Sequence, residues 1–182
     1  MRPTKYDVLI VPGWQDSEPE HWQSLWQTKY GYTRVIQDDW MYPKRQSWVQ
    51  RLSEVAAHYD FPILIAHSMG CSAAGILSAE THIKIAGAFL VSPVDLDLPT
   101  TPEEIKNFLP TPMQRLRFPS MVIASDNDPY CSIQKAQAFA KTWGNTFMNL
   151  GSHGHINVAA GFGPWEEGHH LFQKFLDVCS IL

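Results

Sequence analysis

A serine in the segment His67-Ser68-Met69-Gly70 is the first residue whose type and setting could do chemistry. It follows the apolar run Ile63 to Ala66 and precedes a stretch of small residues, 70–75. A serine on a sharp turn between a strand and a helix projects its hydroxyl into solvent, and such a turn needs small neighbours. Ala66 replaces the first glycine of the usual G-x-S-x-G pattern, and an isolated Ser-x-Gly is more often an ordinary turn. The strand before it and the helix after it favour a nucleophile elbow with Ser68 as the nucleophile.

A serine hydroxyl is a weak nucleophile, so this chemistry requires a histidine to take its proton and a carboxylate to orient that histidine. Two carboxylates, Asp126 and Asp128, follow the apolar run Met121 to Ala124. Catalytic loops of α/β folds lie at the carboxyl ends of strands, so both are candidates. We favour Asp128 because Pro129 stiffens the turn after it, whereas Asp126 lies close enough to the strand to cap the turn.

Two histidines, His153 and His155, follow in a glycine-containing loop, and we favour His155 as the general base. The commonest role of a loop histidine is an ordinary surface residue. A metal site formed by these two residues with His169 and His170 is a further alternative. It is weaker, because adjacent helical residues point to different faces and no carboxylate completes a known zinc pattern. We therefore expect neither a metal nor a cofactor.

Two backbone N–H groups are candidates to stabilise the oxyanion of a tetrahedral intermediate. The Met69 amide lies at a helix N-terminus directly after the predicted nucleophile. The Trp14 amide lies in the loop that follows the apolar run Val8 to Val11. The Trp14 indole, with Phe162 and Trp165, is expected to line a small substrate pocket, although a packing role for the indole is equally plausible.

These residues need a scaffold, and short apolar runs that alternate with helical patterns predict a parallel α/β sheet of about six strands. The runs are Val8 to Val11, Thr33 to Ile36, Ile63 to Ala66, Ala88 to Val91, Met121 to Ala124 and, more weakly, Thr146 to Leu150. Apolar residues recur at spacings of three and four within 22–26, 48–59, 133–143 and 171–176. Helices are therefore expected on both faces of the sheet. The proline-rich stretch 93–119, with one short helix around 103–108, is expected to form a small flap rather than a cap domain.

Length, composition and charge restrict the number of domains and the kinds of partner that we expect. With 182 residues, 45% of them hydrophobic, the chain is expected to be one domain, 1–182. A net charge of −4 without a basic cluster argues against nucleic acid. Three widely spaced cysteines suggest no disulfide framework, and residues 1–7 contain no long apolar run, so we expect neither a leader nor a membrane segment. We expect a cytoplasmic protein that does not bind membranes, whose partner is a small-molecule acyl substrate; a protein partner stays an open alternative that no motif indicates.

The motifs together resemble the small single-domain serine hydrolases that include bacterial YdeN-like proteins and the human retinoblastoma-binding protein 9. The resemblance covers nearly the whole chain. It rests on segments 11–14, 21–22, 39–48, 67–71, 125–130, 154–157 and 161–165. It implies a compact α/β-hydrolase fold without a substantial cap, with Ser68 as nucleophile, Asp128 as acid and His155 as base. The natural substrates of this family are poorly defined.

The expected function is hydrolysis of a small carboxylic ester, amide or thioester through an acyl-enzyme on Ser68. A stretch as short as 93–119 cannot form a large lid, so we expect an open site for short acyl groups. One rival is a binding protein on a hydrolase scaffold, because fold alone does not fix function. Another is a metallohydrolase or a cysteine-dependent enzyme that uses Cys71 or Cys131.

Overall fold

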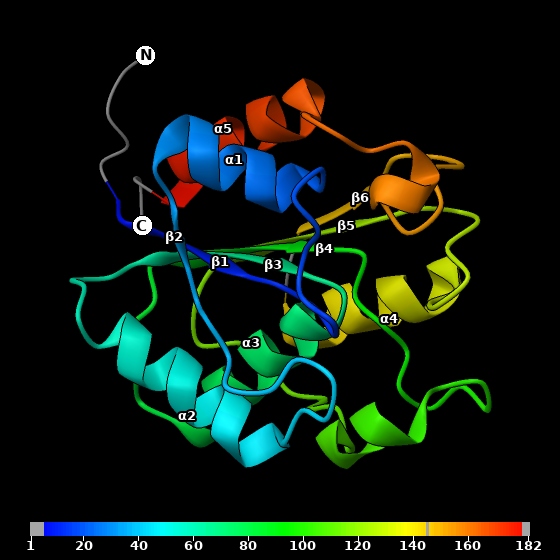
Figure 1. Cartoon of the computed structure of the whole chain (residues 1–182), viewed down its shortest axis with the longest axis horizontal. Coiled ribbons are helices and arrows are strands. Elements are labelled where there is room, and N and C mark those ends of the chain that lie inside the picture. The colour runs from blue at the N-terminus through cyan, green and yellow to red at the C-terminus, as the bar shows by residue number, and fades with distance from the viewer. Residues whose placement is uncertain (1–5, 145, 180–182) are drawn as a thin grey trace.

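The computed structural model describes residues 6–144 and 146–179 and contains a six-stranded, wholly parallel sheet (Figure 1). The strand order is β2-β1-β3-β4-β5-β6. The strands are β1 (Val8–Val11), β2 (Thr33–Arg34), β3 (Ile63–His67), β4 (Gly87–Val91), β5 (Ser120–Ala124) and β6 (Thr146–Asn149). The α/β class and the parallel six-stranded sheet predicted from the sequence are confirmed.

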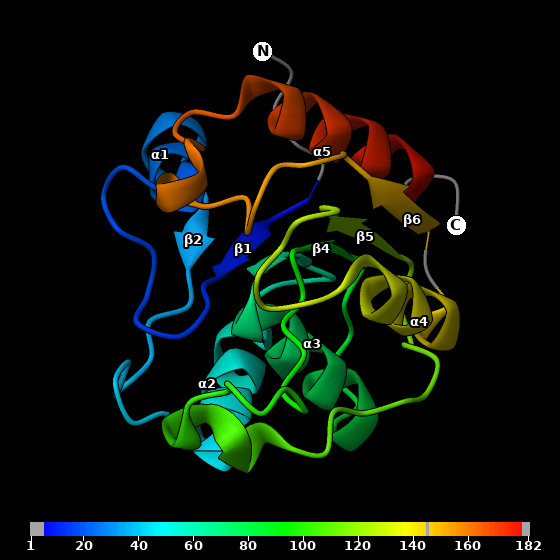
Figure 2. The ribbon, with the colours of Figure 1, turned by 90° about the vertical axis from the view of Figure 1, so that its right-hand side faces the viewer.

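Two helical layers cover the sheet, with α1 and α5 on one face and α2, α3 and α4 on the other (Figures 1 and 2). The helices are α1 (Trp22–Tyr30), α2 (Arg45–Ala56), α3 (Met69–Glu80), α4 (Ile133–Trp143) and α5 (Glu166–Cys179). Because successive side chains of a strand point to opposite faces, Leu9 and Val11 join one apolar core while Val8 and Ile10 join the other. Burial on both faces explains why the inner strands are continuous apolar runs.

The edge strand β2 is shorter than its apolar run predicts, since it ends at Arg34 rather than Ile36. Val35 still donates to Ile10 O and is buried, but Ile36 is 58% exposed as the chain leaves the sheet. Arg34 turns away to form an ion pair with Asp16. The apolar run in the sequence reflects the burial of Val35, and it extends beyond the last residue of the strand.

The segment between β4 and β5 is anchored to the body of the protein. It contains one 3-10 helix, η1 (Glu103–Phe108), and Phe108 is buried against the ring of Trp48. Asn107 Nδ2 donates to Pro43 O, and Arg45 N donates to Asn107 Oδ1. This anchoring fixes one wall of the pocket described below.

Candidate active site

Ser68 lies between β3 and α3 in a strained backbone conformation, with φ 56° and ψ −124°. Its N–H donates to Val91 O on the neighbouring strand, and Cys71 N donates back to Ser68 O. A non-glycine residue at positive φ costs on the order of 1–3 kcal/mol, and such strain persists only where surrounding contacts impose it. The serine is therefore held on the sharp turn that the elbow pattern predicts.

Two glycines allow the loop after β1 to pack directly against this turn. A Cβ at Gly70 would lie 2.3 Å from Val11 O, and a Cβ at Gly13 would lie 2.9 Å from Ser68 Cβ. Both distances are too short for any other residue type. The close approach brings the loop that carries Trp14 beside the serine.

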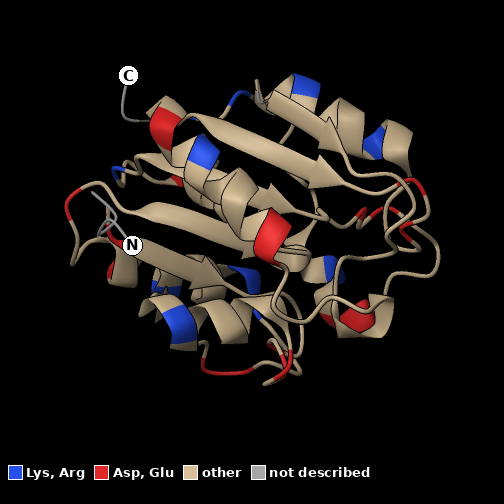
Figure 3. Cartoon of the chain, turned by 90° about the horizontal axis from the view of Figure 1, so that it is seen from above, with Lys and Arg blue, Asp and Glu red and all other residues tan. Residues whose placement is uncertain are grey.

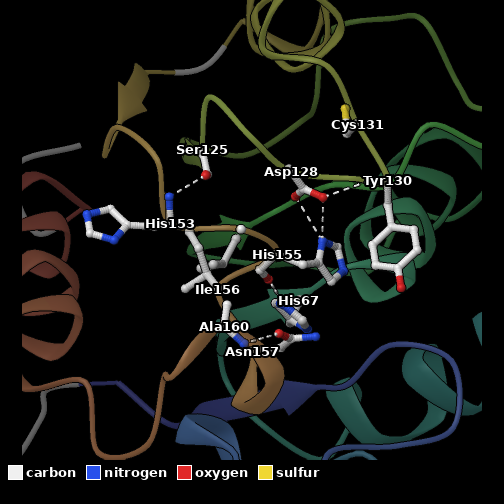
Figure 4. A network of polar contacts seen from close by, with 12 residues as sticks. His67, Ser125, Asp128, Tyr130, Cys131, His153, His155, Ile156, Asn157 and Ala160 are labelled. Atoms are coloured by element: carbon white, nitrogen blue, oxygen red, sulfur yellow. Dashed lines mark hydrogen bonds and ion pairs between the residues drawn. The ribbon is translucent and has the colours of Figure 1, made fainter.

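The Asp128 carboxylate contacts His155 Nδ1 through both of its oxygens, at 2.8 Å and 3.0 Å (Figure 4). Both side chains are buried, and Asp128 Oδ1 also accepts from Tyr130 N. Because an ionised carboxylate can only accept, Nδ1 carries the ring proton and Nε2 is left as an acceptor. Asp126, by contrast, accepts from Asn149 Nδ2 and stabilises the turn, so Asp128 alone of the two contacts the histidine.

Ser68 and His155 line the same pocket, which has a volume of about 330 Å³. Met69 and Trp14 also line it, and the segment after β4 supplies an apolar wall that includes Leu98 and Ile105. None of the described residues accepts a hydrogen bond from the backbone N–H of Met69 or of Trp14. Trp14 and Met69 thus line the pocket with amide groups that are free to donate, and an oxyanion requires donors of this kind.

Two expected pocket residues lie elsewhere, which corrects that expectation. Trp165 packs in the core beneath α1, where its ring stacks on Trp26, and Phe162 lies edge-on to His153. The 3-10 helix η2 (Val158–Ala160) turns the chain away from the pocket before it reaches Phe162. The apolar lining comes instead from the segment after β4, which the sequence identified only as a flap.

Two further histidines, His21 and His67, also line the pocket, and sequence analysis assigned neither a role. His67 Nε2 is 2.9 Å from the backbone carbonyl of His155, and the two rings are 4.8 Å apart. Burial, and then the electrostatic interaction with the His155 ring, hold the pKa of His67 well below its usual range. The signals available in the sequence were the position of His67 next to the nucleophile and the position of His21 in the motif segment 21–22.

The alternative chemistries find little support in the described part of the chain. It contains no group of three or more His, Cys, Asp or Glu side chains that could hold a metal ion. His169 contacts Tyr32 Oη in the core rather than either loop histidine. Burial raises the pKa of the Cys71 thiol far above its usual range and that of Cys131 to about 12, which disfavours a thiolate nucleophile.

No helix in residues 6–144 or 146–179 is long and apolar enough to cross a membrane.

Acidic residues lie in several loops at the carboxyl ends of the strands, where the arrowheads are (Figure 3). Asp16, Glu18 and Asp95 line the pocket, whereas none of the lysines and arginines in the described ranges does. Asp16 and Asp95 are ion-paired with Arg34 and Lys135, and the described pocket lining itself offers no cationic group.

Comparison with known proteins identifies a family and several similar structures. A family model described as serine hydrolase matches residues 8–174. The structure is similar to that of a YdeN-like hydrolase from Pectobacterium atrosepticum, at 34% identity and a TM-score of 0.84, covering 96% of this chain and 92% of that one. The ydeN gene product of B. subtilis is 20% identical, with a TM-score of 0.74 and coverage of 95% and 100%. An esterase from Thermogutta terrifontis is 14% identical, with a TM-score of 0.71 and coverage of 97% and 91%, a likeness of fold alone.

A search of curated proteins found no match. The family match nevertheless covers most of the chain, and the first structural relative is similar over nearly all of it. Both findings confirm the resemblance and the α/β-hydrolase fold that the motifs indicated. The chain belongs to the serine hydrolase family.

Proposed function

We propose that this protein hydrolyses small carboxylic esters, or the related amides or thioesters, through an acyl-enzyme on Ser68. The observation that carries the proposal is the buried Asp128–His155 pair on the same pocket as a strained, strand-terminal serine. In this arrangement Asp128 holds the Nδ1–H tautomer of His155, which leaves Nε2 to accept the serine proton. The carboxylesterase type and the three catalytic roles are proposals that this geometry supports.

In the first half of the reaction, Ser68 Oγ adds to the substrate carbonyl carbon while its proton passes to His155 Nε2. The carbonyl oxygen becomes an oxyanion that accepts from the Met69 and Trp14 amides. When the tetrahedral intermediate collapses, the bond to the leaving group breaks and His155 returns the proton to it. Each oxyanion donor is worth roughly 3–4 kcal/mol, and the general base on the order of 10²- to 10⁴-fold.

In the second half, water replaces the leaving group. His155 takes a proton from the water as its oxygen adds to the acyl carbon. Collapse of the second intermediate breaks the bond to Ser68 Oγ, and the serine recovers its proton from His155. The products are a carboxylic acid and an alcohol, amine or thiol, and no cofactor takes part in these steps.

The size of the pocket supports a short acyl group. A volume of about 330 Å³ is at the small end of the range for ligand pockets, and the anchored segment after β4 limits its extension.

We also propose a reducing compartment such as the cytoplasm, supported by Cys71, Cys131 and Cys179 being unpaired thiols.

The test is labelling of the purified protein with a fluorophosphonate probe, which phosphonylates an activated serine. Wild type is expected to label, and Ser68→Ala and His155→Ala are expected to lose labelling. Ser152→Ala and His153→Ala, which alter exposed residues of the adjacent loop, are matched controls that should still label. Labelling that survives in Ser68→Ala, or its absence in folded wild type, would overturn the proposal and favour a binding protein on a hydrolase scaffold.

A further inference from the structure

His21 caps helix α1 with its ring. Its backbone is extended, with φ −66° and ψ 143°, and its Nδ1 accepts from Gln23 N at 3.1 Å. Serine, threonine, aspartate and asparagine usually fill this position because a side-chain acceptor satisfies a free N–H of the first turn. A backbone N–H can only donate, so Nδ1 presents a lone pair and carries no proton.

The ring of His21 is neutral at ordinary pH, which fixes the position of its single N–H. Burial lowers the pKa of His21 to about 3, and electrostatic interactions with Arg34 and with the His155 ring add to the effect. A neutral imidazole whose Nδ1 is an acceptor must carry its hydrogen on Nε2. Helix capping and burial thus make Nε2 a permanent donor.

This donor is open to the substrate pocket. His21 is only 2% exposed, and it lines the pocket together with Ser68 and His155. None of the described residues accepts a hydrogen bond from Nε2. In the described chain, the fully buried side-chain nitrogen and oxygen atoms without a hydrogen-bond partner are Arg51 Nε and Ser92 Oγ. His21 Nε2 is not among these atoms, so it is accessible from the pocket.

Asn157 presents a second donor to the same pocket. Its Oδ1 accepts from Ala160 N at 3.1 Å, which fixes the orientation of the amide. The amide nitrogen consequently points away from Ala160 (Figure 4). No described residue accepts from this nitrogen, and Asn157 lines the pocket.

Donors in a pocket bind water until a ligand arrives. A ligand that displaces such water binds well only where it replaces the lost hydrogen bonds. No lysine or arginine is among the described residues that line the pocket, and Asp16 is already paired with Arg34, so the pocket offers no cation to a carboxylate. The group that suits the donors is a neutral acceptor oxygen.

We propose that His21 Nε2–H, assisted by the Asn157 amide, binds a second oxygen of the substrate, separate from the scissile carbonyl. This inference rests on the proposed function and narrows its substrate class. Preferred substrates are small esters or amides that carry an ether, hydroxyl or carbonyl oxygen within a few bonds of the reacting group. His21 is then a specificity residue, and the triad remains the source of the chemistry.

The test compares esters that differ by one acceptor oxygen. On the alcohol side the pair is n-butyl butanoate and 2-methoxyethyl butanoate, and on the acyl side p-nitrophenyl pentanoate and p-nitrophenyl 3-methoxypropanoate. The two members of each pair have equal numbers of heavy atoms. The variant is His21→Asn, because asparagine retains an acceptor for the helix cap and its shorter side chain cannot place an amide N–H where the ring Nε2–H lies. The readout is kcat/KM for the ether ester divided by kcat/KM for the alkyl ester. This ratio is compared between wild type and variant, so the intrinsic reactivity of the two esters cancels.

For at least one pair, His21→Asn is expected to lower this ratio by about threefold to tenfold, the effect of one neutral hydrogen bond. The same substitution at the exposed His170 should leave the ratio as in wild type. If His21→Asn fails to fold, Asn157→Asp replaces it, since aspartate keeps the acceptor for Ala160 N and loses the amide donor. A ratio that neither His21→Asn nor Asn157→Asp changes in either pair would overturn the inference while the proposed hydrolysis stood.

Binding to Ser68→Ala separates the two proposals. Calorimetric titration of this variant with each ester pair is expected to show tighter binding of one ether ester, and the added His21→Asn change should remove that preference. If wild type hydrolyses no ester while this binding preference is found, the proposed function fails and the His21 inference survives. Equal binding of ether and alkyl esters in both pairs would overturn the inference.

Discussion

His67 Nε2 donates a hydrogen bond to the backbone carbonyl of His155 across 2.9 Å, which joins the end of the nucleophile strand to the loop of the predicted base. The carbonyl can only accept, so the hydrogen of the His67 ring lies on Nε2. The residue beside the serine in sequence therefore positions the histidine that lies 88 residues later.

His67→Leu should lower kcat/KM by about tenfold to a hundredfold, because the loop that carries His155 loses its tether and small displacements of catalytic groups are costly. His67→Gln, whose amide can also donate, should recover part of this loss. Ester hydrolysis and thermal unfolding of both variants provide the measurement. Equal activity of His67→Leu and wild type would show that the bond does not position His155.

Asp128→Asn should reduce kcat by about 10³- to 10⁴-fold, because an amide can favour the wrong tautomer of His155. The matched control is Asp126→Asn, two residues earlier, which touches Asn149 rather than the histidine. It should change kcat little and lower the free energy of unfolding by about 1 kcal/mol. Comparable activity losses in the two variants would contradict the assignment of Asp128.

Gly70→Ala should destabilise the fold by about 3 kcal/mol or more, because the new methyl group would lie 2.3 Å from Val11 O. Gly75→Ala, in the same helix, is the control, since its methyl group would be 3.6 Å from the Trp143 ring, an ordinary contact. That variant should be as stable as wild type or more stable by up to about 1 kcal/mol. Urea unfolding of the two variants measures the difference.

Stability should fall as the pH drops below about 6.5, the unfolded-state pKa of histidine. Burial lowers the folded-state pKa of His21 to about 3 and that of His169 to about 4, so the unfolded chain binds more protons in this window. Stability from each group is complete above pH 6.5 and declines by about 1.4 kcal/mol per pH unit toward its folded pKa.

Urea unfolding between pH 7.5 and 4.5 should show this decline, and His169→Gln should make it shallower. His170→Gln, which alters an exposed residue, is the control and should leave the slope unchanged. An identical slope in His169→Gln and wild type would show that His169 is not buried in its neutral form.

The inner strands and the nucleophile turn could be predicted from the sequence because their causes are local. Val8–Val11 is apolar throughout since both faces of β1 are covered, and Ser68 lies between an apolar run and small residues that a sharp turn requires. A local pattern does not report where pairing stops at a sheet edge. The end of β2 at Arg34 was therefore missed.

Only the tertiary structure decided which side chains meet in the pocket. Asp128 and His155 are 27 residues apart and His67 and His155 are 88 apart, so their contacts depend on strand order and on the path of each loop. For the same reason Phe162 belongs to the packing around His153, whereas Leu98 reaches the pocket. Residue type and spacing determine which groups could react, and long-range packing determines which of them share one cavity.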